Sequence, residues 1–132
     1  MTPAQRFAAV PVARLATVRA DGAPHLVPIV FALLSDDVIV SAVDGKPKRS
    51  RALRRLANIA AEPRVSVLAD HYEQDWSRLW WVRADGVARV RPAYPEGLAA
   101  LVERYPQYRQ APPAGPFVEI TVARWSAWAA GA

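Results

Sequence analysis

The sequence predicts a mainly β (α+β) protein, a small β-barrel with short helical insertions, from three observations. Segments that alternate apolar and polar residues recur along the chain, with turn-forming residues between them. Only short stretches show the apolar periodicity of a helix. The 132 residues, 52% of them hydrophobic, suit a single domain over residues 1–132 with one core.

The N-terminal part is predicted to begin with a short helix from Thr2 or Pro3 to Val10, because proline is tolerated in a first helical turn. A strand over 12–19 and an apolar strand over 24–34 follow, joined by a hairpin turn at Asp21-Gly22. Pro28 indicates a sheet edge or a bulge in the second strand. Together with a β-branched strand over 38–43, these strands are expected to form an antiparallel meander.

A helix is predicted over 51–61, ending at Glu62-Pro63. Its apolar face is expected to hold Leu53, Leu56, Ala57 and Ala60, and its polar face Arg51, Arg54, Arg55 and Asn58. Strands over 64–69 and 79–91 come next, the second broken or bulged near Asp85-Gly86. The chain is completed by a helix over 94–104, an irregular segment over 105–116 and a strand over 117–128.

The composition excludes several classes of protein. Without cysteine there is no disulfide framework, no thiolate metal site and no cysteine nucleophile. The N-terminus lacks the apolar stretch of a signal peptide, and no apolar run has the length of a transmembrane helix. We therefore expect a cytoplasmic protein that does not enter a membrane. The net charge of +5 favours anionic partners, although heavy arginine use also fits a GC-rich coding sequence.

The most informative segment is KPKRSRALRR, from Lys46 to Arg55, which holds six of the seventeen Lys and Arg residues. No acid occurs between Asp44 and Glu62. A strand is predicted before the segment, and a helix begins inside it. Backbone N–H groups at a helix start attract anions, and basic side chains there would otherwise oppose the helix dipole. A phosphate or carboxylate site is the functional interpretation, and a solvated basic helix start is its alternative.

Other features give weaker indications. His25 and His71 are isolated, so no metal site is predicted. The five tryptophans are expected in the core and in a subunit interface, and Tyr72, Tyr105 and Tyr108 are candidates for the border of a substrate pocket. Phosphate-loop, Rossmann and hydrolase motifs are absent, which agrees with chemistry carried by a cofactor. The catalytic residue is therefore unknown.

Two motifs carry a family resemblance. The segment ARLATVRADGAPHLVPIVFAL opens with the pattern A-x-L-A-T-x-x-x-D-G-x-P, and EPRVSVLAD places Pro-Arg before an apolar strand. With the first helix and the basic stretch, this order resembles the flavin-binding family typified by pyridoxamine 5′-phosphate oxidase, over nearly the whole chain. The resemblance implies a six-stranded antiparallel split β-barrel with short flanking helices.

Within that family, DGKPKRSRALRRLANI and YEQDWSRLWWVRADGVARV look most like the small branch that binds the deazaflavin coenzyme F420. The resemblance implies a homodimer with the cofactor at the subunit interface. It implies a phosphate site at Lys46, Lys48, Arg49, Ser50 and Arg51, and a ring site along Val27, Pro28, Ile29 and Val30, largely through backbone groups. Because the helix is about a turn longer than in the oxidase, the basic residue that meets the phosphate stays open.

The implied function is an F420-dependent oxidoreductase that transfers a hydride between the deazaflavin and an unsaturated or quinone-like small molecule. F420 carries a phosphodiester and an oligoglutamate tail, so an extended run of bases, including Arg54 and Arg55, suits it better than compact FMN. The alternatives are an FMN-dependent oxidase or reductase and a cofactor-binding protein without turnover. A nucleic-acid binder is disfavoured, because the bases cluster at one strand-to-helix junction.

Overall fold

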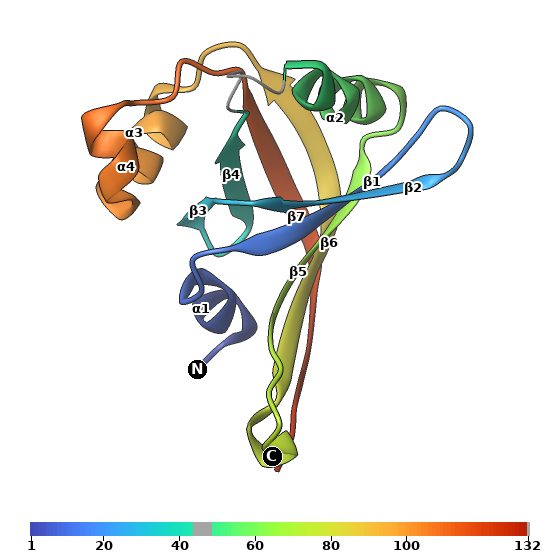
Figure 1. Ribbon diagram of the computed structural model, residues 1–132, viewed down its shortest axis with the longest axis vertical. Helices are drawn as coiled ribbons and strands as arrows, with labels where there is room; N and C mark the ends of the chain where they lie inside the picture. Colours follow the sequence, from blue (N-terminus) through green and yellow to red (C-terminus); the bar gives the residue numbers. More distant parts are fainter. Residues whose placement is uncertain (44–48, 132) are drawn as a thin grey trace.

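The computed structural model describes residues 1–43 and 49–131, with side chains for all of these except 49–53. These residues form one antiparallel sheet of seven strands with short helices around it (Figure 1). The predicted mainly β fold with short flanking helices is confirmed. The strand order across the sheet is β2-β1-β5-β6-β7-β4-β3.

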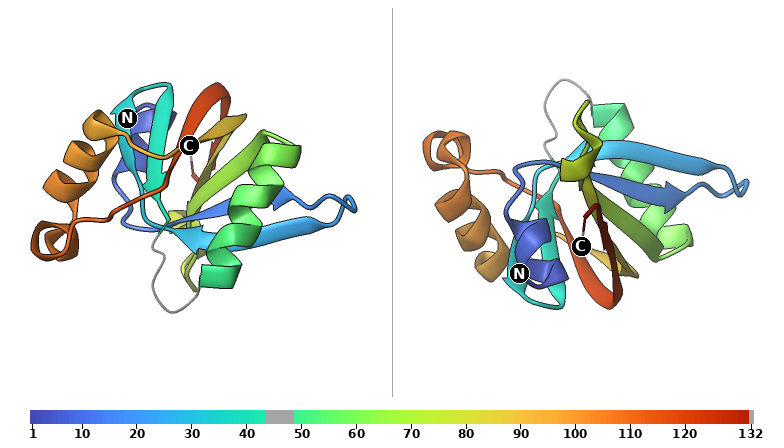
Figure 2. Two further views of the ribbon diagram at one scale, coloured as in Figure 1. Left: turned by 90° about the horizontal axis from the view of Figure 1, so that it is seen from above. Right: turned by 90° about the horizontal axis from the view of Figure 1, so that it is seen from below.

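The elements follow one another as α1 (Pro3–Ala8), β1 (Ala13–Val18), β2 (Pro24–Ile29), β3 (Ala32–Ser35), β4 (Val38–Ala42), α2 (Arg49–Ala61), β5 (Arg64–His71), the 3-10 helix η1 (Trp76–Arg78), β6 (Trp80–Arg91), α3 (Pro95–Arg104), α4 (Pro106–Gln110) and β7 (Phe117–Ala129). The long strands β5, β6 and β7 continue into an arm that ends at η1 and the C-terminus (Figure 1). Helix α2 and the pair α3–α4 lie on opposite sides of the other end (Figure 2).

Several local predictions are confirmed because short-range chemistry decides them. Thr2 caps α1, with Gln5 completing a capping box. Gly22 has a φ of 87°, and the Asp21 carboxylate accepts a hydrogen bond from the Ala23 N–H at 3.0 Å, which shapes the hairpin turn. The register of β6 on β7 shifts between Asp85 and Gly86, where the irregularity was predicted, although β6 is unbroken and the extra residue, Ala123, lies on β7.

The predicted strand over 24–34 is wrong, because it forms two strands, β2 and β3, at opposite edges of the sheet. Between them, the Phe31 N–H donates to the Tyr105 hydroxyl at 3.0 Å, so a side chain holds this backbone instead of a neighbouring strand. The antiparallel β1–β2 and β3–β4 hairpins of the predicted meander form, but the meander is not continuous, because β2 does not run on into β3 and β4 pairs with β7 on its other side. The edge position indicated by Pro28 is confirmed.

Two helix predictions need correction. In α2, Asn58 and Ile59 are buried, whereas Ala57 and Ala60 are exposed, so the helix is rotated relative to the predicted apolar face. Asn58 tolerates burial because its side chain is hydrogen-bonded within the protein. The segment predicted as irregular over 105–116 contains α4, which begins with Pro106 at its first position.

The main core lies between the sheet, α1 and α2. Its centre includes an aromatic group in which the Phe7 ring lies 4.7 Å from Phe31 and 5.2 Å from Trp125, measured between centroids. A smaller cluster under α3 contains Tyr94, Leu101 and Phe117. Among the tryptophans, Trp80 and Trp125 pack against the main core, while Trp76 and Trp128 are exposed.

Candidate cofactor-binding site

The predicted phosphate-binding residues fall at the least described part of the chain. Lys46 and Lys48 lie outside the described residues. Arg49, Ser50 and Arg51 occupy the first turn of α2, and their side chains are among those not described. Their contact with a phosphate therefore stays a prediction.

The predicted ring-binding residues lie on and just after β2. Ile29 belongs to the core, and Val27 packs partly against it. Pro28 is exposed on the other face of the strand, and Val30 is half-buried beyond its end. Because β2 is an edge strand, with β1 as its neighbour on one side, backbone groups on its other side remain open to a ligand. That geometry is compatible with the backbone contacts predicted along 27–30.

Further along β2, His25 lies directly opposite Thr17 of β1. The Asn58 side-chain amide of α2 donates to the Thr17 hydroxyl at 3.0 Å, and this buried contact holds the helix over the hairpin. Residues three and four positions apart share a helix face. Arg55 and Arg54 therefore lie one turn before Asn58, on the side of the helix that packs on β1, and their charges act on His25. We call Arg19, His25, Arg54 and Arg55 the basic cluster.

The basic cluster has electrostatic features that an anion would relieve. His25 Nδ1 and Arg55 Nε are buried and have no hydrogen-bond partner among the described residues. Burial lowers the pKa of the Arg55 guanidinium. Burial, together with the positive charges of Arg54, Arg55 and Arg19, lowers the pKa of His25. A carboxylate or phosphate beside these groups would satisfy the two nitrogens and offset the repulsion.

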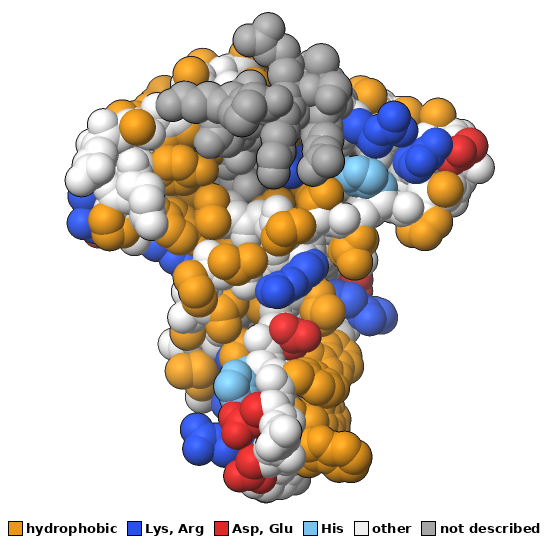
Figure 3. Space-filling model, in the orientation of Figure 1, with side chains coloured by type: hydrophobic (Ala, Val, Ile, Leu, Met, Phe, Trp, Pro, Cys, Tyr) orange, Lys and Arg blue, Asp and Glu red, His pale blue; other side chains and the backbone are white. Residues whose placement is uncertain are grey.

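Few negative charges lie near the basic cluster. Arg19 forms an exposed ion pair with Asp21 at 3.2 Å. Within the described side chains, neither Arg54 nor Arg55 forms an ion pair. Figure 3 shows basic side chains beside a histidine at this end of the molecule. The arrangement is suited to holding an anionic group against α2 and β2.

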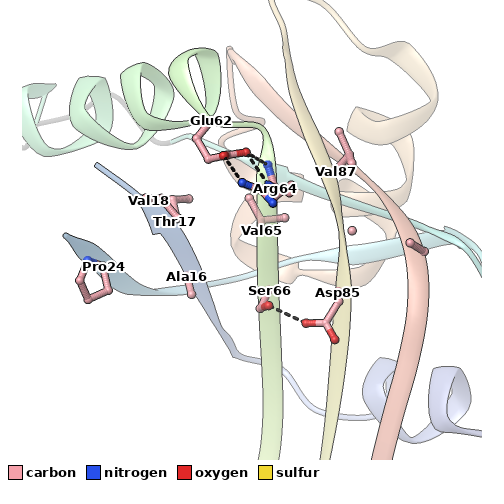
Figure 4. A pocket seen from close by; sticks show the side chains of 12 residues that line it. Ala16, Thr17, Val18, Pro24, Glu62, Arg64, Val65, Ser66, Asp85 and Val87 are labelled. Atoms are coloured by element: carbon pink, nitrogen blue, oxygen red, sulfur yellow. Dashed lines mark hydrogen bonds and ion pairs between the residues drawn. The ribbon is translucent and has the colours of Figure 1, made fainter. Parts of the chain in front are cut away.

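The outer face of the sheet carries a cavity of about 620 Å³, lined by Ala16, Thr17, Val18, Pro24, Glu62, Arg64, Val65, Ser66, Asp85, Gly86, Val87 and Ala123 (Figure 4). Near α2, the Arg64 guanidinium hydrogen-bonds Glu62 at 2.7 Å and lowers the pKa of that carboxyl to about 2. Lower in the cavity, the Ser66 hydroxyl donates to Asp85 at 2.6 Å. These carboxylates are therefore already paired, so the unpaired positive charge of the region comes from the basic cluster.

A second cavity of about 570 Å³ adjoins the first, sharing Ala16 and Ser66 with it. It is lined by Arg14, Ala16, Leu26, Ser66, Leu68, Asp70, Tyr72, Trp81 and Arg83. Leu26 is 66% exposed and Tyr72 61% exposed, which is unusual for such large side chains on a sheet face. The Arg83 guanidinium lies 5.8 Å from the Trp81 ring centroid and 3.1 Å from Asp85. Large exposed apolar side chains therefore share this cavity with Arg14, Asp70 and the ion-paired Arg83.

Sequence reasoning identified part of this site. It included Arg54 and Arg55 only as candidates for an acidic cofactor tail, and it treated His25 as an isolated histidine. The alternation of β2 places His25 on the same face as Val27, but only the packing of α2 brings two arginines to it. Among residues 1–43 and 49–131, no three His, Cys, Asp or Glu side chains gather as metal ligands would. No helix in those ranges is long and apolar enough to cross a membrane.

The sheet order and the flanking helices define a protein of the split β-barrel class. The chain belongs to the pyridoxamine 5′-phosphate oxidase family, whose sequence profile matches residues 3–129. No curated protein matches the chain significantly.

Solved structures support the fold. A conserved hypothetical protein from Mycobacterium tuberculosis is 25% identical, with a TM-score of 0.70 over 96% of this chain and 81% of that one. A heme-binding protein from Mycobacterium smegmatis is 24% identical, with a TM-score of 0.71 over 99% of this chain and 55% of that one. A FAD-binding protein from Mesorhizobium loti is 22% identical, with a TM-score of 0.67 over 93% and 88%.

Proposed function

We propose that this chain binds coenzyme F420 and acts as an F420-dependent oxidoreductase on an unsaturated or quinone-like small molecule. The observation that carries the proposal is the basic cluster, where Arg55 Nε and His25 Nδ1 are buried without hydrogen-bond partners among the described residues. Burying polar nitrogens in this way is unfavourable unless a ligand satisfies them. An anionic cofactor group at this position supplies the missing acceptors.

The shape of the basic region favours an extended anion. Arg54 is exposed and Arg55 half-buried, so the cluster offers one base at the surface and one beneath it. In the sequence, four more basic residues precede them between Lys46 and Arg51. A phosphodiester followed by a carboxylate tail can engage bases at several points, whereas the phosphate of FMN ends the molecule. Arginine suits both groups because its guanidinium makes paired hydrogen bonds to carboxylate and phosphate.

The roles of the residues follow from this placement. Arg54, Arg55 and His25 hold the anionic part of the cofactor, and the free edge of β2 from Val27 to Val30 supports the ring through backbone groups. When bound, the deazaflavin supplies the hydride chemistry. The protein contributes orientation and exclusion of water. No described side chain has the position of a catalytic acid, and water can deliver the proton that accompanies the hydride.

We also propose that the functional unit is a homodimer built on the outer face of the sheet. Leu26, Tyr72 and Trp81 line one cavity there, and the adjoining cavity carries the half-exposed Val87. A second copy of the chain would bury these side chains and close the two cavities. Apolar faces of this kind are typical of subunit contacts.

The test is a titration of ligand-stripped protein with F420, FMN, FAD and haem, followed by fluorescence or absorbance. Flavin and haem are included because structurally similar proteins carry those names. We expect F420 to bind at micromolar concentration or tighter, with the other ligands at least tenfold weaker. A preference for FMN or FAD would move the protein to a flavin-dependent oxidase or reductase. Binding of none of the four would overturn the redox proposal.

Variants sharpen the titration. Arg54→Ala and Arg55→Ala should each weaken F420 binding, and the loss should grow with the length of the oligoglutamate tail if these residues meet the tail. An equal loss at every tail length would assign them to the phosphate instead. Arg78→Ala is the charge-matched control, because Arg78 lies on η1 at the tip of the arm, far from α2 (Figure 1). Assays with reduced F420 and a panel of enones and quinones then separate an enzyme from a carrier.

A further inference from the structure

A separate pocket of about 370 Å³ lies where α4 meets the chain just before β1 and just after β2, a volume within the range of small-molecule sites. It is lined by Pro11, Val12, Val30, Tyr105, Gln107 and Tyr108. Ala13 pairs with Ile29 beside it, whereas Thr17 pairs with His25 at the far end of the same two strands. The pocket and the basic cluster therefore lie at opposite ends of β2.

One wall of the pocket is fixed by the Tyr105 hydroxyl. It accepts a hydrogen bond from the Phe31 N–H at 3.0 Å, and its own proton faces the carbonyl oxygens of Phe31 at 2.8 Å and Pro11 at 2.9 Å. The hydroxyl is thus fully engaged with the backbone, and the ring presents apolar surface. The Tyr108 ring packs edge-on against it, with 5.8 Å between centroids.

Arg104 of α3 also holds the segments that form this pocket. Its guanidinium donates to the Phe31 carbonyl at 2.9 Å and to the Val10 carbonyl. It also lies 4.5 Å from the centroid of Phe31 and 5.2 Å from that of Tyr105. These contacts tie α3 and α4 to the segments before β1 and after β2. The pocket is therefore preformed, which lowers the entropic cost of binding a ligand there.

The lining determines the kind of ligand. Two valines, a proline and two aromatic rings make the walls apolar, and the Gln107 amide is the polar side chain that lines the pocket with a free choice of donor or acceptor. None of the six lining residues carries a charge. Such a pocket favours a flat, uncharged ring with one or two carbonyl groups over an anion or a sugar.

We propose that this pocket binds the ring of the substrate, a quinone or a similar flat carbonyl compound. The inference rests on the proposed function, because Val30 continues the β2 edge assigned to the cofactor ring. Val30 follows His25 by five positions, which corresponds to about 16 Å along an extended strand. A cofactor anchored by its anionic part at His25 can run along β2 and bring its ring toward the substrate held at the other end.

The first test observes the pocket directly. Protein with ¹³C-labelled valine methyl groups is titrated with 2-methyl-1,4-naphthoquinone, without cofactor and then with F420 present. The chain has no cysteine for the quinone to alkylate. We expect the Val12 and Val30 methyl signals to shift in a saturable way, while those of Val87 on the outer sheet face stay unchanged. Shifts confined to Val87, or no saturable shift under either condition, would overturn the inference.

Two variants provide the second test. Val12→Trp fills the pocket and should weaken quinone binding at least tenfold. Tyr108→Ala should also weaken it, whereas Tyr72→Ala, a tyrosine lining the outer-face cavity, should leave it unchanged. Melting curves establish that each variant is folded. If Val12→Trp does not fold, the affinity of Tyr108→Ala for the quinone is the test. Equal affinity in Tyr108→Ala and the wild type would count against the pocket.

The two proposals fail separately. Quinone binding at Val12 and Val30 in a protein that binds no F420 would refute the proposed cofactor and still support the quinone pocket. F420 binding at the basic cluster, with no quinone response at Val12 and Val30, would refute the substrate pocket and leave the proposed cofactor standing.

Discussion

The Asn58 side-chain amide of α2 donates a 3.0 Å hydrogen bond to the Thr17 hydroxyl of β1, although 41 residues separate the two in sequence. Both residues are almost completely buried. The contact sets the rotation of α2 about its own axis and so decides which of its side chains face the hairpin. The charges of Arg54 and Arg55 act on His25 because Asn58 is held at Thr17.

The first prediction concerns this buried pair. Asn58→Ala removes the donor and Thr17→Val removes the acceptor, and each leaves a buried polar group without its partner. We expect either change to lower the free energy of unfolding by about 1–3 kcal/mol in urea denaturation. The double variant Thr17→Val/Asn58→Ala should cost less than the sum of the two single changes. Strict additivity would show that the pair is not coupled.

A second prediction separates stability from binding at Arg55. Its buried Nε has no partner among the described residues, so Arg55→Met should stabilise the ligand-free protein, by about 1 kcal/mol. The same change should weaken binding of the anionic cofactor, because a thioether cannot donate a hydrogen bond. Paired melting curves and titrations measure both effects. A destabilised Arg55→Met protein with unchanged affinity would contradict the role of Arg55 as an anion ligand.

The third prediction is a pH dependence from His25. The pKa of His25 is lower in the folded protein than in the unfolded chain. As the pH falls, His25 is therefore protonated at a higher pH in the unfolded chain than in the folded protein. The free energy of unfolding should therefore decrease below about pH 6.5, the usual pKa of histidine, and His25→Gln should remove that part of the decrease. A steeper loss in His25→Gln than in the wild type would contradict the assignment.

Ligand binding should shift the pKa of His25 in the opposite direction, upward. A bound anion favours the protonated ring and raises the pKa of His25, so the complex takes up a proton. Affinity for F420 should then increase from pH 8 to pH 6, by at most about tenfold for each unit by which the pKa rises. The phosphodiester of F420 does not titrate between pH 6 and pH 8, so it does not contribute to this change. His25→Gln should bind equally at both pH values, as measured by fluorescence titration.

The fourth prediction concerns Gly86 of β6, at the register shift between β6 and β7. A Cβ at Gly86 would collide with the Thr121 carbonyl oxygen and lie 3.0 Å from the Val122 Cα, both of them backbone atoms. Gly86→Ala should therefore destabilise the protein by about 1–3 kcal/mol, because the two strands must separate. Thr121→Ala, at an exposed residue of the neighbouring strand, should change stability by no more than about 0.5 kcal/mol. Chemical denaturation compares the two, and equal effects would contradict the close approach.

The fifth prediction tests the proposed homodimer. Leu26 is 66% exposed at the outer-face cavity, so Leu26→Glu would place a charge in the apolar contact. We expect sedimentation to show a dimer for the wild type and a monomer for this variant, with unchanged circular dichroism. Ala99→Glu, at an exposed position of α3, is the control and should remain dimeric. A wild-type monomer at high micromolar concentration would refute the proposal.

Much of the fold could be predicted from the sequence because local chemistry decides it. Alternation of apolar residues marks most strands, Asp21-Gly22 marks the hairpin, and Pro28 marks an edge strand. The basic residues 46–55 likewise indicate an anion site without any knowledge of packing. Each of these signals depends on residues within a few positions of one another.

Tertiary contacts decided the rest. The break between β2 and β3 depends on Tyr105, which hydrogen-bonds Phe31 from 74 residues away. The rotation of α2, and with it the meeting of His25 with Arg54 and Arg55, depends on the bond between Asn58 and Thr17. A local pattern cannot encode such pairs, because the free energy of burying a polar group depends on whether a distant residue supplies its hydrogen-bond partner.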